Sequence, residues 1–201
     1  HLAATLTLAM PAVLWASQQP LTRQQAVAIQ QPKIQLAILL DTSNSMDGLI
    51  DQARQQLWQV VNEFSKAKRD GMTPVLEVAV YEYGNNGIDA ERGHVHQVAE
   101  LTRELDRVSE ALFSLTTDGG DEYCGHAIAH AVAHLQWSAS PDDVKAIFIA
   151  GNEPFNQGPT PFTDAIEGAR ARGIVAAPYT TELPVAIRGA KYRWARNAGL
   201  L

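Results

Sequence analysis

The chain has 201 residues, of which 46% are hydrophobic and 19% are charged, an ordinary balance for a folded globular protein. A formal net charge of −6 argues against a nucleic-acid-binding surface, which requires a basic face. The single cysteine, Cys124, excludes an internal disulfide and a cysteine-based zinc site. The length suits one domain with a short tail.

Residues 2–16 form an apolar stretch that ends in small residues and is followed by a polar Ser-Gln-Gln sequence. Such a stretch is too short to span a membrane comfortably and has the length of a signal-peptide hydrophobic region. We therefore expect residues 1–16 to be a signal-peptide remnant or an anchor, with a buried helix as the alternative. Residues 17–33 are rich in Gln, contain two prolines and are expected to be a linker. The domain would then occupy residues 34–201 of an exported protein, periplasmic or associated with the cell envelope.

Residues 33–46 form the predicted centre of the domain. Residues 34–40 are almost all apolar, which is typical of a strand buried on both faces. The strand ends at Asp41, Ser43 and Ser45, and in a parallel sheet this is the end where the ligand crevice opens. One carboxylate and two hydroxyls are hard oxygen donors, which select Mg²⁺, Ca²⁺ or Mn²⁺. In the alternative interpretation, these side chains only cap the next helix.

Helical and strand patterns alternate along the rest of the chain. They predict an α/β fold with a doubly wound, mostly parallel sheet, one antiparallel edge strand, and helices on both faces. The expected helices cover residues 48–68, 105–115, 125–137, 162–172 and 187–197, and the further strands cover residues 75–83, 94–101 (the antiparallel edge), 144–150 and 174–179.

Two later loops carry further oxygen ligands. The loop 116–125 places acidic and hydroxyl side chains around paired glycines, and residues 152 and 153 follow the strand 144–150. The acidic side chains of the first of these loops could supply a carboxylate ligand to the metal. Alternatively, Asp121 or Glu122 could cap the helix that follows. The candidate residues in these two loops are Thr117, Asp118, Asp121, Glu122, Asn152 and Glu153.

The strand with residues 41–46, together with residues 119–122 and 149–155, resembles the von Willebrand factor A (VWA) domain, in particular exported bacterial members. The resemblance implies a metal-ion-dependent adhesion site (MIDAS), in which a threonine of the second loop and an aspartate of the third loop join the first motif. Thr117 has the right chemistry for the second loop, whereas Asp121 has the better position. The third-loop aspartate is missing. Either Asn152 or Glu153 substitutes, or the site coordinates through water there, or metal binding is degraded.

Three histidines, His126, His130 and His134, follow a helical spacing and should lie on one stripe. An i, i+4 pair can bind zinc, but the sequence lacks the H-E-x-x-H arrangement. We interpret them as a polar stripe beside the core face of the helix. Cys124 and His126 lie two positions apart and do not face each other, which disfavours a thiol nucleophile with its base.

These observations predict a binding module rather than an enzyme, because no general base, nucleophile or cofactor loop is evident. The expected function is divalent-cation-dependent adhesion or assembly, with Mg²⁺ as the first choice and Mn²⁺ or Ca²⁺ as alternatives. The expected partner is a protein or peptide, bound through an acidic side chain, and the N-terminus is a possible membrane tether. Two alternatives stay open: a VWA scaffold that binds partners without metal, and a Mg²⁺- or Mn²⁺-dependent phosphohydrolase using Asp41 and Asp121.

Overall fold

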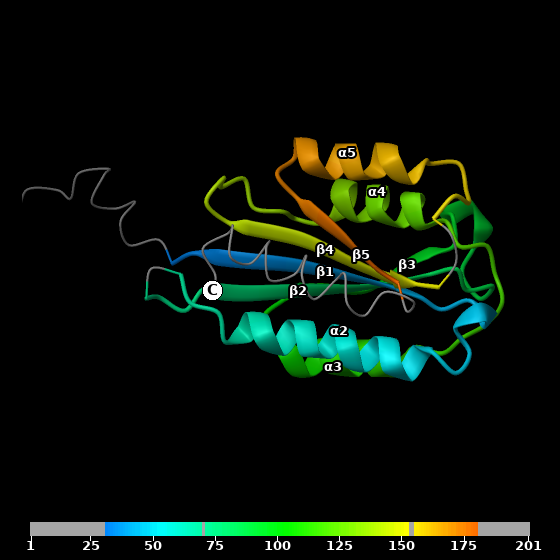
Figure 1. Cartoon of the computed structure of the whole chain (residues 1–201), viewed down its shortest axis with the longest axis horizontal. Coiled ribbons are helices and arrows are strands. Elements are labelled where there is room, and N and C mark those ends of the chain that lie inside the picture. Colours follow the sequence, from blue (N-terminus) through cyan, green and yellow to red (C-terminus); the bar gives the residue numbers. More distant parts are fainter. Residues whose placement is uncertain (1–30, 70, 153–154, 181–201) are drawn as a thin grey trace, which may run out of the picture. The chain divides into compact units, whose positions relative to one another are not determined.

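A computed structural model of the chain describes residues 31–69, 71–152 and 155–180. In this part of the chain, strands form one sheet in the order β3-β2-β1-β4-β5 (Figure 1). The predictions for residues 1–30 and for a helix over 187–197 lie outside the described residues. The strands are β1 (Lys33–Asp41), β2 (Val75–Tyr83), β3 (Val95–Thr102), β4 (Val144–Gly151) and β5 (Val175–Thr180).

The register of the strands aligns the carboxyl ends of three neighbouring strands at one end of the sheet. β1 runs parallel to both β2 and β4, and β4 runs parallel to β5, whereas β3 pairs antiparallel with β2. Asp41 is paired with Tyr83, and Leu40 with Ala150, so β1, β2 and β4 end side by side. The predicted fold class, a mostly parallel α/β sheet with one antiparallel edge strand, is confirmed.

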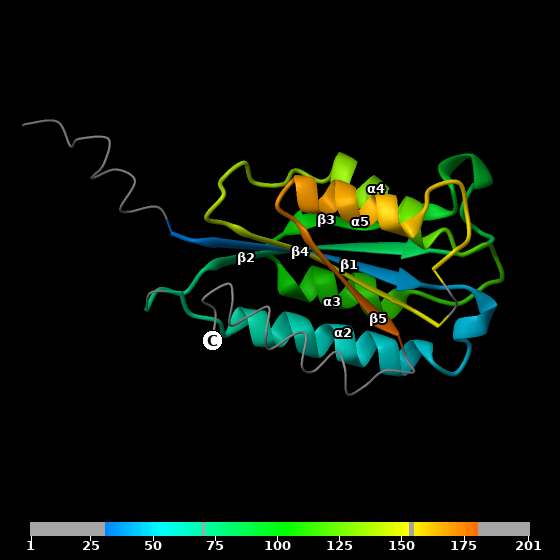
Figure 2. The ribbon, with the colours of Figure 1, turned by 45° about the horizontal axis from the view of Figure 1, so that its top comes forward.

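β1 is buried on both faces, as its apolar run predicts, because successive side chains enter two different cores. Leu36 and Leu40 pack with helices α2 (Ile50–Ser65) and α3 (Leu105–Ser114). Leu39, between them, packs on the opposite face with α4 (Cys124–His134) and α5 (Phe162–Ala171). Figure 2 shows the two helix pairs on opposite faces of the sheet.

Helix boundaries differ from the predicted ones at a few ends. The chain first makes a 3₁₀ turn, η1 (Asn44–Met46), so α2 begins later than expected. α4 ends at His134, because Leu135 adopts an extended conformation with ψ 145°, and the Trp137 indole then donates to the Ala131 carbonyl. A second 3₁₀ turn, η2 (Ala90–Arg92), precedes β3. Among the described helices, none combines the length and the apolar character needed to cross a membrane.

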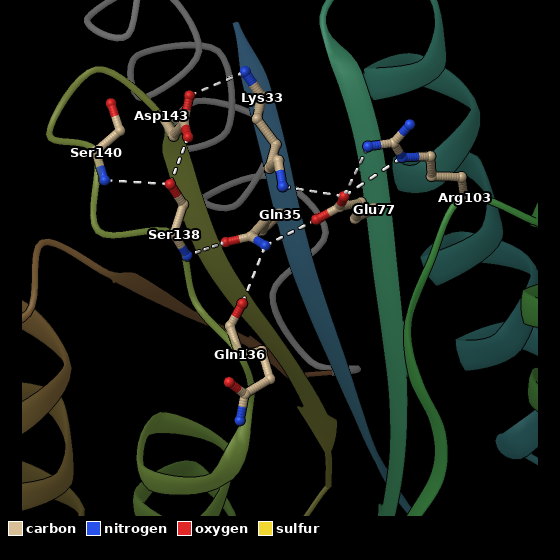
Figure 3. A network of polar contacts seen from close by, with 8 residues as sticks. All are labelled: Lys33, Gln35, Glu77, Arg103, Gln136, Ser138, Ser140 and Asp143. Atoms are coloured by element: carbon tan, nitrogen blue, oxygen red, sulfur yellow. Dashed lines mark hydrogen bonds and ion pairs between the residues drawn. The ribbon is translucent and has the colours of Figure 1, made fainter.

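A polar network joins the amino ends of β1, β2 and the loop before β4 (Figure 3). Gln35, only 2% exposed, lies at its centre. Its Nε2 donates to Glu77 Oε2 at 2.8 Å and to the Gln136 carbonyl at 3.3 Å, while its Oε1 accepts from the Ser138 amide at 2.7 Å. The side chain therefore replaces the hydrogen bonds that water would offer to three polar groups, one in β2 and two in the loop before β4.

Candidate metal centre

The three oxygen-bearing residues of the first loop lie together at the carboxyl end of β1. Asp41 is 1% exposed, and its Oδ1 accepts a hydrogen bond from the Ser43 amide at 2.9 Å. This bond bends the chain as it leaves the strand. The hydroxyl oxygens of Ser43 and Ser45 lie 2.8 Å apart. The spacing of the motif therefore gives the convergence that the sequence predicts.

The capping interpretation is wrong for both acidic loops. Leu49 occupies the N-cap position of α2 and has no side-chain acceptor. Ser43 occupies the N-cap position of η1 but makes no side-chain cap hydrogen bond. α4 is preceded by Tyr123, again without a side-chain cap. The 3₁₀ turn separates the first motif from α2, and the helix dipole is left without the side-chain acceptor that capping would supply.

The third loop contacts the first through Asn152. The Ser45 hydroxyl donates to Asn152 Oδ1 at 2.9 Å, and Asn152 Nδ2 donates to the Ser45 carbonyl at 3.0 Å. A hydroxyl has one proton and two lone pairs. Ser45 uses its one hydroxyl proton in the hydrogen bond to Asn152, so Ser43 must be the donor in the hydrogen bond between the two serines. Ser45 then keeps one lone pair that a cation could bind. The other third-loop candidate, Glu153, lies outside the described residues.

The donor set fits a hard divalent cation. Ligands on adjacent vertices of a Mg²⁺ octahedron, each bonded at about 2.0–2.1 Å, lie roughly 2.9 Å apart. The 2.8 Å between the two serine oxygens matches that separation. Glycines on both sides leave room for the Asp41 carboxylate: a Cβ on Gly84 would lie 3.0 Å from Oδ1, and a Cβ on Gly151 would lie 3.1 Å from Oδ2.

The acidic second loop is anchored to Thr42, the residue after β1, but two of its predicted ligands bond to other partners. The Asp118 amide donates to the Thr42 carbonyl at 3.0 Å. The Thr117 hydroxyl donates to the Asp47 carboxylate. Asp121 is exposed and accepts from the Tyr123 hydroxyl at 3.1 Å, and this bond raises the pKa of Tyr123.

Glu122 is the acidic residue of the second loop that lies beside Asp41. Its Cγ would be 3.3 Å from a Cβ on Gly84, the same point that lies 3.0 Å from Asp41 Oδ1. Gln157, in the segment after β4, donates from Nε2 to Glu122 Oε2 at 2.6 Å. From the sequence, Glu122 is a possible metal ligand or a rim residue. Gln157 is not predicted, because nothing in its sequence context indicates this contact.

Two neutral groups, Tyr83 and Cys124, are buried close to these acids. Burial raises the pKa of Tyr83 well above its ordinary value, and the nearby Cys124, Asp41 and Glu122 raise it further. Burial also raises the pKa of the Cys124 thiol, and Asp41 adds to this effect. The thiol is therefore protonated at neutral pH and is a poor nucleophile. The alternation of β2 and the register with β1 place Tyr83 here, although the sequence analysis treated it only as a strand residue.

The histidine stripe predicted on α4 is confirmed as a polar flank of that helix. The rings of His130 and His134 are stacked with centroids 4.0 Å apart, and those of His126 and His130 are 6.4 Å apart. With His96 of β3 they line a groove of about 660 Å³. Burial lowers the pKa of His130, and the adjacent imidazoles lower it further. In the described part of the chain, no group of three or more His, Cys, Asp or Glu side chains is arranged to hold a metal ion.

Comparison at the sequence level gives a partial match. The Ligase-CoA domain family matches residues 156–201, under a quarter of the chain and outside the first two site loops. No curated protein matches the sequence significantly.

Solved structures match a much larger part of this chain than the family model does. Proximal thread matrix protein 1 from the mussel byssus is 14% identical, with 75% of this chain and 36% of that chain covered and a TM-score of 0.56. Another structure of that protein, with a zinc-occupied MIDAS motif, gives the same TM-score. The pilus adhesin SpaC from Lactobacillus rhamnosus GG is 12% identical, with 75% and 24% covered and a TM-score of 0.55.

This chain has a VWA-like fold. At 12–14% identity the likeness extends to the fold alone. The VWA-like chain spans 24–38% of the length of these matched structures. The candidate site is therefore described by the chain's own residues: Asp41, Ser43 and Ser45 from the first loop, Glu122 from the second and Asn152 from the third.

Proposed function

We propose that this VWA-like chain is a protein-binding module that holds a divalent cation, Mg²⁺ in the first place, at Asp41, Ser43 and Ser45. The observation that carries the proposal is the 2.8 Å approach of the two serine hydroxyls beside the buried Asp41. The VWA-like fold supports it, because the matched mussel protein has a zinc-occupied MIDAS motif and SpaC is a pilus adhesin.

Each residue of the proposed site has its own role in cation binding. Asp41 contributes the negative charge, and Ser43 and Ser45 contribute neutral oxygens, so the ligand set does not neutralise a divalent ion. Asn152 Oδ1 accepts the hydrogen bond from the Ser45 hydroxyl, which orients a lone pair of Ser45 toward the site. A bound cation supplies a positive centre for the carboxylate of a protein or peptide partner. Thr117 and Asp121, the second-loop candidates from the sequence, are each engaged with another side chain in the structure.

The proposed setting is the cell envelope or the periplasm of a bacterium, with residues 1–16 serving as export signal or membrane tether. The apolar residues 2–16 support this proposal. A pilus adhesin among the matched folds is compatible with it.

The test is a calorimetric titration of the 201-residue chain with Mg²⁺, Mn²⁺ and Ca²⁺. We expect saturable binding in the wild type, and binding weaker by roughly tenfold or more in Asp41→Asn and Ser43→Ala. Asp106→Asn, an exposed carboxylate on α3, is the charge-matched control and should bind as the wild type does. Cation binding that is the same in Asp41→Asn and in the wild type would remove the proposal.

A cation-free binding scaffold is the second candidate. It is favoured by one observation: Ser43, Ser45 and Asn152 already satisfy one another through hydrogen bonds of 2.8 and 2.9 Å. Partner binding that persists in EDTA and in Asp41→Asn would support it. Turnover of a generic phosphate ester that requires Mn²⁺ and Asp41 would instead indicate the phosphohydrolase.

A further inference from the structure

We propose that Glu122 shares the cation with Asp41 and that Gln157 positions the Glu122 carboxylate. This inference rests on the proposed cation site and assigns the second-loop ligand to a residue other than Thr117 or Asp121.

The geometry around Gly84 carries the proposal. Gly84 follows β2 with φ +80°, and three side chains surround the position that a Cβ there would take. Asp41 Oδ1 lies at 3.0 Å, Glu122 Cγ at 3.3 Å and Ser43 Cβ at 3.5 Å from that position. Two residues of the first motif and one residue of the second loop therefore meet over a single glycine.

The two other second-loop candidates are already bonded to other side chains, which favours Glu122 as the ligand. The Thr117 hydroxyl is engaged by Asp47, and the exposed Asp121 by Tyr123. Glu122 is half-buried, and its Cγ lies on the same side of Gly84 as Asp41 Oδ1 and Ser43 Cβ.

Gln157 holds one oxygen of Glu122 and leaves the other for a ligand. Its Nε2 donates to Glu122 Oε2 at 2.6 Å, and a neutral amide orients the carboxylate without cancelling its charge. The contact also ties the loop before α4 to the segment after β4. Gln157 is thus a positioning residue that acts through Glu122.

Two acidic side chains around Gly84 have consequences for the site with and without a cation. Without a cation, Asp41 and Glu122 repel each other, which costs stability. With a cation, the second charge strengthens binding before any partner arrives and reduces the remaining attraction for a partner's carboxylate. The site then retains its cation in the free protein.

The experiment compares thermal unfolding of the full chain in EDTA and during Mg²⁺ titration. Glu122→Gln should raise the melting temperature in EDTA, because one like charge is removed, and should weaken Mg²⁺ binding roughly tenfold or more. Gln157→Leu should weaken binding by roughly threefold. The charge-matched control Glu100→Gln, exposed on β3, and the competing candidate Asp121→Asn should each stay within roughly twofold of the wild type.

The outcomes separate this inference from the proposed function. If Asp41→Asn loses the Mg²⁺ response while Glu122→Gln binds like Glu100→Gln, the role of Glu122 is overturned and the site stands. A larger loss in Asp121→Asn than in Glu122→Gln also overturns it. If the wild type itself shows no Mg²⁺ response, the proposed function fails, and the inference fails with it.

Discussion

Acidic residues at the two ends of the sheet have different kinds of partners. At the amino end, Glu77 meets the Lys33 ammonium at 3.1 Å, the Arg103 guanidinium at 3.4 Å and the Gln35 amide at 2.8 Å (Figure 3). At the carboxyl end, the Ser43 backbone amide donates to Asp41, and the Gln157 side-chain amide donates to Glu122. The acid at the amino end is therefore held by two cationic side chains as well as an amide, and its role there is structural.

This difference separates stability from function along the same strands. The amino-end network satisfies buried groups such as Gln35 and the Lys145 ammonium, which donates to the Ser138 carbonyl at 3.0 Å. Groups of this kind are costly to leave without partners. Changes there should affect folding and spare cation binding, whereas changes at the carboxyl end should act mainly on cation binding.

The largest expected effect is on folding, from Gln35→Leu. The substitution leaves the Ser138 amide and the Gln136 carbonyl without their Gln35 partner and should lower the free energy of unfolding by about 2–3 kcal/mol. Urea unfolding in EDTA measures this loss. The Mg²⁺ affinity should stay within roughly twofold of the wild type, since the site is at the other end of the strands. A change below about 0.5 kcal/mol would show that the network is not structural.

Next in size is the effect of Ser45→Ala on binding. It removes one proposed ligand oxygen and the hydrogen bond to Asn152. We expect Mg²⁺ binding to weaken roughly tenfold, about 1.4 kcal/mol. Unfolding in EDTA should change by less than about 1 kcal/mol. Ser114→Ala, an exposed serine at the end of α3, is the control for calorimetry, and equal affinities in the two variants would contradict the assignment of Ser45.

A smaller effect concerns the pH dependence of stability at the amino end. Burial alone would raise the pKa of Glu77, but hydrogen bonds from Gln35 and Lys33, the charge of Lys33 and the hydrogen bond from Arg103 together lower it below 4.5. A lowered pKa in the folded state means that the stabilisation is complete above the unfolded value and is lost as the pH falls through the folded value.

The test is urea unfolding of the wild type and Glu77→Gln between pH 7 and pH 3. We expect Glu77→Gln to be less stable at pH 7 by roughly 1 kcal/mol, after allowance for solvent screening, and the gap to close below about pH 4. Glu100→Gln provides the matched control on an exposed strand residue. A gap that persists unchanged at pH 3 would contradict the role of the ionised carboxylate.

Asn152→Ala should have the smallest effect. It removes two hydrogen bonds to Ser45 but no first-motif oxygen. Mg²⁺ binding should weaken by roughly threefold, about 0.6 kcal/mol, because Ser45 loses its orienting acceptor. Calorimetry compares it with Ser45→Ala, and a loss as large as in that variant would indicate that Asn152 itself binds the cation.

Local pattern was enough to predict the fold and the first motif. The boundaries of β2 agree with the predicted strand 75–83, and the apolar run of β1 predicted its burial on both faces. The convergence of Ser43 and Ser45 follows from short spacing at the end of a buried strand. Helix ends were less predictable: α4 stops at His134, where the Trp137 indole bonds back to the Ala131 carbonyl, a local contact that the helical periodicity does not indicate.

The contacts that complete the site were beyond the sequence because they join distant loops. Glu122 meets Gln157 across 35 residues, and Thr117 meets Asp47 across 70 residues. Which of several acids in a flexible, glycine-containing loop faces Asp41 is decided by how the loops pack, and composition and spacing carry no information about that packing.

The most direct test of the central claim is anomalous diffraction from crystals of the chain soaked with Mn²⁺. We expect one strong peak at the carboxyl end of β1, with the ion bonded to the Ser43 and Ser45 hydroxyl oxygens beside Asp41, as the proposed cation site requires. A peak in the histidine groove of α4 with none at Asp41, or serine oxygens that do not share the ion, would contradict it.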